Sequence, residues 1–205
     1  ENFHNAIRTS EGGHDFVACL ETDRAGNFFY SDPLGLHRVS PNGARQETLA
    51  AGWRNPIGLS VSPDGVITVS PQEGEWTPAS MVCPAKPRDE RSDSRGSSIP
   101  HFGYGGPKNG KPPELPLVYL PRGLDNSSGG QVYVSSDRWG PMHGQIIHTS
   151  YGHGSHFLVL RDEVDGQAQG AIVPLAGEFL SGAHRARFNP KDGQLYVSGM
   201  AGWGT

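Results

Sequence analysis

The sequence predicts an all-β fold built from repeated antiparallel hairpins, as in a β-propeller. Short alternating strand patterns recur along the 205-residue chain, and one hairpin signal occurs three times in imperfect copies. No stretch of twelve or more residues has the periodicity of an amphipathic helix. Repeated strand–turn–strand units are typical of propellers, whose blades are four-stranded antiparallel sheets of about 40–45 residues.

The repeated hairpin signal is a proline followed by Asn-Gly or Asp-Gly, and it ends at Gly43, Gly65 and Gly193. Proline presets φ, and the Asn-Gly or Asp-Gly pair supplies the positive φ of a tight turn. The strand patterns cover residues 16–21, 27–31, 36–40, 57–62, 66–70, 131–136, 144–149, 157–160, 170–174, 185–189 and 194–198.

Eleven or twelve strands make about three blades, whereas a closed propeller has roughly 4–8. We therefore expect residues 1–205 to form one partial propeller domain of three to four blades, and we expect the chain to be a fragment of a longer protein, because a partial propeller leaves exposed sheet edges. Residues 84–116 are polar and rich in Gly and Pro. We interpret them as a surface loop inserted between blades.

Composition excludes several classes of protein. The net charge of −4 offers no basic surface for nucleic acid, and no run of 18 apolar residues could form a transmembrane helix. Cys19 and Cys83 could form one disulfide, although Cys19 lies in an apolar alternation that favours a buried free thiol. The chain has no Cys-x-x-Cys-His motif, so no haem is attached covalently within it.

The residues that best predict a functional site flank the second hairpin. Arg54 and Asn55 precede its first strand, and Gln72 and Glu73 follow its second strand. In an antiparallel pair joined by a tight turn these ends lie side by side, so the four side chains should converge on one rim of the sheet. The alternative is that Arg54 only braces neighbouring blades through backbone carbonyls.

Two further polar clusters are candidates. Asp125 and Asn126 precede two glycines at the entry of a strand, where they could orient a ligand hydroxyl or bind a cation. The alternative is an Asx-turn that caps the strand. Arg122 precedes the cluster and could pair with Asp125. Four histidines at 143, 148, 153 and 156 could bind Cu, Zn or Fe, or they could be solvated loop residues around an inward-facing His148.

The four tryptophans, Trp53, Trp76, Trp139 and Trp203, each stand at a turn or at a strand end. We expect them to pack between blades, because aromatic burial dominates core energetics. Stacking on sugar rings is the alternative function for these side chains.

The run Gly52-Trp-Arg-Asn-Pro-Ile-Gly58, with its Pro-Asp-Gly hairpin and Gln-containing loop, resembles the soluble glucose/sorbosone dehydrogenases. Those proteins are six-bladed propellers that use pyrroloquinoline quinone. The chain is still more similar to the large propeller proteins of planctomycetes and verrucomicrobia classed as membrane-bound dehydrogenases, which often continue into a haem-binding cytochrome c domain. This second resemblance extends over most of the chain, through residues 26–30, 35–40, 76–80, 120–130, 139–141 and 193–199.

The resemblance implies a set of functional residues. Arg54 and Asn55, with Gln72 beside them, would contact the quinone, and the loop at Glu73 and Gly74 would hold a calcium ion through carbonyl and carboxylate oxygens. The general base of the family is a histidine from an earlier blade. His4 and His14 lie in the right direction along this chain, but neither is in a matching motif.

These observations lead to two hypotheses of different classes. The first is a periplasmic or secreted dehydrogenase-like domain that oxidises a sugar with a quinone and passes electrons to a cytochrome c-type domain elsewhere in a longer chain. The second is a non-catalytic propeller that uses the same rim to bind a carbohydrate or a partner protein. The Arg54-Asn55-Pro56 turn favours the enzyme, and the unplaced base favours the binding protein.

Overall fold

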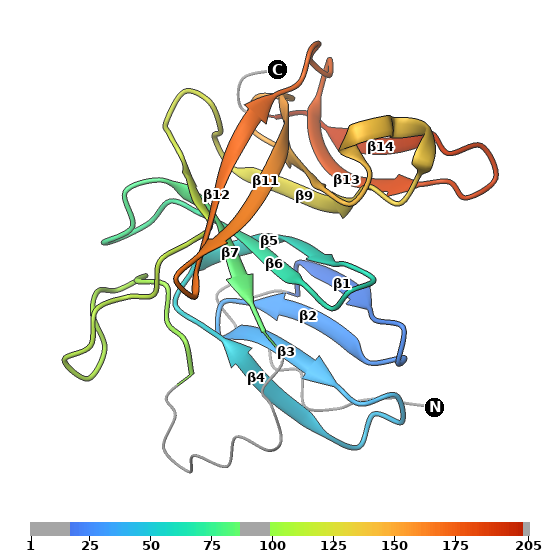
Figure 1. Ribbon diagram of the computed structural model, residues 1–205. Coiled ribbons are helices and arrows are strands. Elements are labelled where there is room, and N and C mark those ends of the chain that lie inside the picture. The colour runs from blue at the N-terminus through green and yellow to red at the C-terminus, as the bar shows by residue number, and fades with distance from the viewer. Residues whose placement is uncertain (1–16, 87–98, 203–205) are drawn as a thin grey trace.

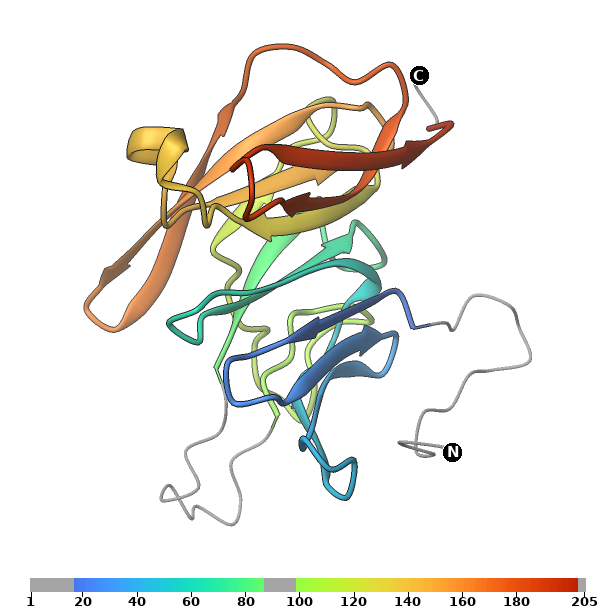
Figure 2. The same cartoon turned by 90° about the vertical axis from the view of Figure 1, so that its right-hand side faces the viewer.

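The computed structural model describes residues 17–86 and 99–202, which form fourteen strands in four antiparallel sheets. The sheets follow one another along the chain, and Figure 1 shows the first sheet at the bottom, the second in the middle and the other two above it. Figure 2 shows the same succession after a turn of 90°. The arrangement is that of successive propeller blades, so the predicted all-β fold class is confirmed.

Each blade is a run of strands that are neighbours in the sequence and in the sheet. The first contains β1 (Cys19–Thr22), β2 (Phe28–Asp32), β3 (Gly35–Val39) and β4 (Gln46–Ala50). The second contains β5 (Arg54–Val61), β6 (Ile67–Gln72), β7 (Ser80–Ala85) and β8 (Val118–Leu120). The third contains β9 (Ser128–Tyr133), β10 (Ile146–Ser150), β11 (His156–Val164) and β12 (Gln167–Pro174). The fourth has two strands among the described residues, β13 (Gly182–Phe188) and β14 (Leu195–Met200).

The three hairpin signals form the turns that their residues predict. Gly43, Gly65 and Gly193 all have positive φ, between 69° and 83°. Each closes its turn by donating its backbone N–H to a carbonyl three or four residues earlier, on Ser40, Ser62 and Asn189 respectively. These turns join β3 to β4, β5 to β6 and β13 to β14. The predicted three to four blades are therefore three complete sheets and a two-stranded fourth.

The insertion lies within the second blade and not between blades, which corrects the sequence-based expectation. Strands β7 and β8 are neighbours in one sheet, and the chain between them includes residues 99–117. Pro84 and Ala85 belong to β7 itself. Residues 87–98 are outside the described part of the chain.

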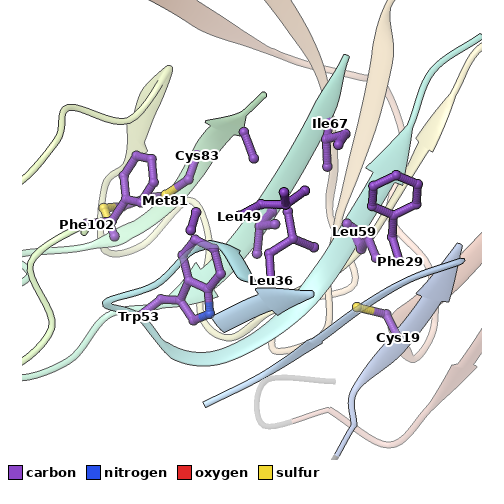
Figure 3. Packing of buried hydrophobic residues seen from close by; sticks show 13 residues of the cluster. Cys19, Phe29, Leu36, Leu49, Trp53, Leu59, Ile67, Met81, Cys83 and Phe102 are labelled. Atoms are coloured by element: carbon purple, nitrogen blue, oxygen red, sulfur yellow. The ribbon is translucent and has the colours of Figure 1, made fainter. Parts of the chain in front are cut away.

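Apolar side chains pack where one sheet meets the next. The largest cluster joins the first two blades and contains Trp53, Phe29 and Leu59, together with Phe102 from the insertion (Figure 3). A second cluster around Val82 and Ile146 joins the second blade to the third, and a third cluster joins the third blade to the fourth. Cys19 and Cys83 are buried and free, so the disulfide alternative is wrong.

The described residues contain one helix, a short 3₁₀ segment at Asp137–Met142. Within the same residues, no helix is long and apolar enough to span a bilayer.

Candidate functional site

The rim predicted from the second hairpin exists. Strand β5 begins at Arg54, strand β6 ends at Gln72, and these two residues are paired in the sheet register. The register shifts between Arg54 and Gly58, and Asn55 within this irregularity has a φ of 43°. A positive φ is uncommon outside glycine, although Asn adopts it more readily than most residues. The irregularity takes Asn55 out of the regular ladder directly after the Arg54–Gln72 pair, as bulges beside functional sites commonly do.

Contacts along this rim join its residues directly. The Asn55 Nδ2 donates to Gln72 Oε1 over 3.4 Å, and Arg54 Nη1 donates to the backbone carbonyl of Glu73 over 3.1 Å. The Arg54 side chain is exposed and makes no other hydrogen bond to the described residues, so most of its guanidinium donors are not engaged by them. The predicted convergence of Arg54, Asn55, Gln72 and Glu73 is confirmed at the level of geometry.

A polar pocket of about 220 Å³ lies between this rim and the entry of the third blade. It brings Glu73 together with Asp125 and Asn126, which the sequence placed in a separate cluster. Arg122 links the two parts, because its Nε donates to Glu73 Oε2 over 2.6 Å. The expected Arg122–Asp125 pair is therefore wrong. The lining is completed by Ser80, Gly123, Ser127 and His153.

Asp125 is buried at the inner side of this pocket. Its Oδ2 accepts hydrogen bonds from Ser128 Oγ at 2.8 Å and from His148 Nε2 at 3.2 Å. Burial by itself raises the pKa of Asp125, but the hydrogen bond and charge of His148, with the hydroxyls of Ser150 and Ser128, outweigh burial and lower the pKa. Asp125 is thus held as a carboxylate, and His148 faces inward as expected.

The loop at Tyr151–Gly154 packs directly against the Asp125–Ser127 segment. The backbone N–H groups of Tyr151 and Gly152 both donate to the carbonyl of Ser127, over 2.9 and 3.3 Å. A Cβ on Gly152 would overlap the backbone carbonyl of Asn126. Ser127 has a φ of 68°, a second strained backbone position at the pocket. This contact brings His153 to the pocket. No sequence motif predicts that His153 lies beside Glu73 and Asp125.

The four histidines do not form one metal centre. His143 lies 3.3 Å from Asp137, His148 is held by Asp125, and His156 packs against Phe179 with a ring separation of 5.1 Å. Burial lowers the pKa of His156. Throughout residues 17–86 and 99–202, no three side chains of His, Cys, Asp or Glu are grouped so as to hold a metal ion.

The oxygens predicted to hold calcium are engaged by donors. The Glu73 carbonyl accepts from Arg54, the Glu73 carboxylate accepts from Arg122, and the Gly74 carbonyl accepts from the backbone N–H of Thr77 at 3.1 Å. Two of these donors are guanidinium groups, whose positive charge opposes a divalent cation. The oxygens of Glu73 and Gly74, arranged in this way, do not fit a calcium ion. Arg54, Asn55 and Gln72 do fit an anionic quinone, since a guanidinium fork and an amide donor suit carboxylate and quinone oxygens.

The tryptophans are divided between core and surface. Trp53 is 1% exposed and Trp139 packs edge-on against Phe188, as expected for residues between blades. Trp76 is 65% exposed, so the packing prediction is wrong for this residue. Trp203, His4 and His14 lie outside the described residues.

The comparisons with known proteins show the fold. No family model matches the chain, and no curated protein matches it significantly. A crystal structure from Thermus thermophilus, named a candidate oxidoreductase (glucose dehydrogenase), is similar at 17% identity and a TM-score of 0.63, covering 95% of this chain and 62% of that one.

Two other solved structures are similar. A structure of a glucose dehydrogenase has 18% identity and a TM-score of 0.64, covering 87% of this chain and 59% of that one. A gluconolactonase from Xanthomonas campestris has 17% identity and a TM-score of 0.53, covering 96% of this chain and 61% of that one. The chain thus spans about 60% of the length of these structures, and it shares their β-propeller fold.

Proposed function

We propose that this chain is part of a sugar-binding, dehydrogenase-like propeller, and that the pocket between Glu73 and Asp125 holds the sugar. The observation that carries this proposal is the composition of the pocket: the Glu73 carboxylate, a guanidinium, an amide and hydroxyl groups line a volume of about 220 Å³, and the buried Asp125 carboxylate lies behind them. Sugar hydroxyls both donate and accept hydrogen bonds, so they need such mixed partners. The glucose-related names of the similar propellers agree with this ligand class.

Arg54, Asn55 and Gln72 are proposed to bind pyrroloquinoline quinone beside the sugar. When bound, this quinone supplies the two-electron acceptor of the reaction. Arg54 has donors directed to solvent, and the Asn55–Gln72 hydrogen bond fixes the amide next to it. Calcium would require Arg122 to release Glu73, so the present arrangement of oxygens opposes that part of the family pattern.

The remaining parts of the dehydrogenase hypothesis are proposals about the longer protein. They are a histidine base, a cytochrome c-type domain that receives the electrons, and a periplasmic or secreted location. His148 does not supply the base, because it is fully buried and bound to Asp125.

A dye-reduction assay with the full-length protein tests the enzyme. The protein is incubated with pyrroloquinoline quinone, with and without Ca²⁺, and reduction of an artificial acceptor is followed with aldoses as substrates. We expect quinone-dependent reduction that Arg54→Ala lowers at least tenfold through loss of quinone affinity. Arg24→Ala, which removes another exposed arginine, is the matched control. Quinone binding that is absent, or unaffected by Arg54→Ala, would contradict the proposal.

A non-catalytic sugar-binding propeller is the second candidate. It is favoured because Glu73 and Asp125 are both committed to partners, Arg122 and His148, within the pocket. Calorimetric titration with monosaccharides separates the two candidates, since binding without dye reduction supports this one. Arg122→Gln should weaken sugar binding about tenfold, whereas Arg138→Gln, which alters an exposed arginine bonded to Asp192, should not.

A further inference from the structure

Trp76 is exposed in a way that packing does not explain. Its side chain is 65% accessible, whereas Trp53 is buried in the first core. One side of its indole lies beside Gly106, which is itself buried beneath it, and a Cβ on Gly106 would touch the ring at 3.8 Å. The indole therefore has Gly106 beside it and remains largely accessible.

The backbone of Trp76 is strained. Its φ is 71°, a region that bulky residues rarely adopt and that costs of order 1–3 kcal/mol when the surroundings impose it. Glycine would relieve this strain, yet the position carries the largest side chain. Strained positions of this kind gather at ligand-binding sites, and Asn55 and Ser127 of the same rim have positive φ as well.

The insertion of the second blade brings a second aromatic ring to this place. Phe102 anchors the insertion in the core by stacking on Trp53 at 5.8 Å, and the Tyr104 N–H donates to the Gly52 carbonyl. Tyr104 is 38% exposed. A Cβ on Gly74 would come within 2.8 Å of its ring and within 3.1 Å of Arg54 Cδ, so the Tyr104 ring and the Arg54 side chain both lie close to Gly74.

The two aromatic rings continue the rim that carries the polar pocket. Trp76 follows Glu73 by three residues, which limits the separation of their Cα atoms to roughly 11 Å. The turn between them is held by a bridge between Gly74 and Thr77, and Gly105 donates its N–H to the Glu75 carbonyl. Arg54, Tyr104 and Trp76 therefore lie close to the segment that carries Glu73, which lines the pocket.

We propose that Trp76 and Tyr104 form an aromatic platform for a second sugar unit, so that the ligand of this site is a neutral oligosaccharide and not a single monosaccharide. This inference rests on the proposed sugar-binding function of the pocket. A sugar ring has an apolar C–H face and a hydroxyl edge, which suits an open indole beside polar groups. One unit would occupy the pocket, and the next would stack on the platform.

The test titrates the full-length protein with paired sugars: glucose with maltotriose and cellotriose, and xylose with xylotriose. Calorimetry gives the affinities, and acrylamide quenching of tryptophan fluorescence reports on the exposed indole. We expect at least one trisaccharide to bind at least tenfold more tightly than its monosaccharide and to protect the indole from quenching. Trp76→Ala should remove that advantage, with monosaccharide affinity changed less than twofold, and Trp76→Phe should retain part of it.

Tyr196→Ala, which removes another exposed aromatic side chain, is the matched control and should change neither affinity. A melting temperature near that of the parent protein shows that each variant is folded. Trisaccharides that bind no more tightly than monosaccharides overturn the platform while the proposed function stands. Sugar affinities unaffected by Trp76→Ala also overturn it and point to a protein partner instead. Absence of any sugar binding overturns both proposals.

Discussion

Asp125 is the buried carboxylate at the inner side of the pocket. Its pKa is lowered from 3.8 in the folded state, so its ionised form stabilises the fold above that value. The stabilisation is lost as the pH falls from about 4 through the folded pKa. We expect Asp125→Asn to flatten the pH dependence of the free energy of unfolding below about pH 4.

The same variant should cost about 1–3 kcal/mol at neutral pH, because the amide leaves a buried donor badly placed against Ser128 and His148. Urea titrations between pH 3 and 7 measure both effects. Ser128→Ala removes one of the hydrogen bonds and should give a smaller change. A variant curve that runs parallel to that of the parent protein would show that Asp125 does not account for the acid sensitivity.

Gly152 sets the geometry of the same pocket through its lack of a side chain. A methyl group there would overlap the Asn126 carbonyl, which is backbone and not the mobile end of a side chain. We expect Gly152→Ala to lower the free energy of unfolding by more than 2 kcal/mol and to weaken sugar binding. Gly65→Ala is the control, since that glycine has open space around it and should cost only about 1 kcal/mol through its positive φ. Equal losses in the two variants would contradict this account.

The sequence predicts the candidate site in part. The pairing of Arg54 with Gln72 could be predicted from the sequence, because the length of a hairpin turn determines which residues of its two strands lie opposite each other. The Glu73–Arg122 bond could not be predicted, because it joins the loop after β6 to the connection between the second and third blades, 49 residues further along the chain. Tyr104 was missed for the same reason, and His153 was expected as a metal ligand and not at this pocket: each reaches the rim through contacts between loops far apart in the sequence.

Among the strands, those with alternating apolar and polar residues and a clear turn signal at one end could be predicted from the sequence. Three strands could not. Gln46–Ala50, Ser80–Ala85 and Val118–Leu120 lack that pattern. Ser80–Ala85 is buried on almost every residue, so it has no polar face to alternate with. Val118–Leu120 is too short for any periodicity to be visible.

The insertion is an element whose position depends on one anchor. Phe102→Ala removes the ring that stacks on Trp53 and should lower the free energy of unfolding by about 3–5 kcal/mol. It should also release residues 99–106 and increase amide exchange at Tyr104, whose N–H is bonded to Gly52. Hydrogen-exchange mass spectrometry measures this change. Unaltered exchange at Tyr104 would show that the insertion is held by other contacts.

At the scale of the whole molecule, each apolar cluster is shared between neighbouring blades, so none of the complete sheets has a core of its own. We therefore expect the described part of the chain to unfold in one transition. Leu59→Ala in the first core and Ile147→Ala in the third should each cost about 2–5 kcal/mol and shift that single transition. Urea unfolding followed by circular dichroism and by fluorescence checks this, and two separate transitions would contradict it.

The contact between Gly152 and Asn126 has a consequence for how this protein can be altered. Two loops that touch without a gap cannot be redesigned one at a time, since a longer or bulkier version of either would displace the other. A change of ligand preference at this rim therefore requires residues 121–128 and 151–154 to be exchanged as a matched pair. The exposed Trp76 side chain lies outside that contact, so it can be exchanged without altering the matched pair.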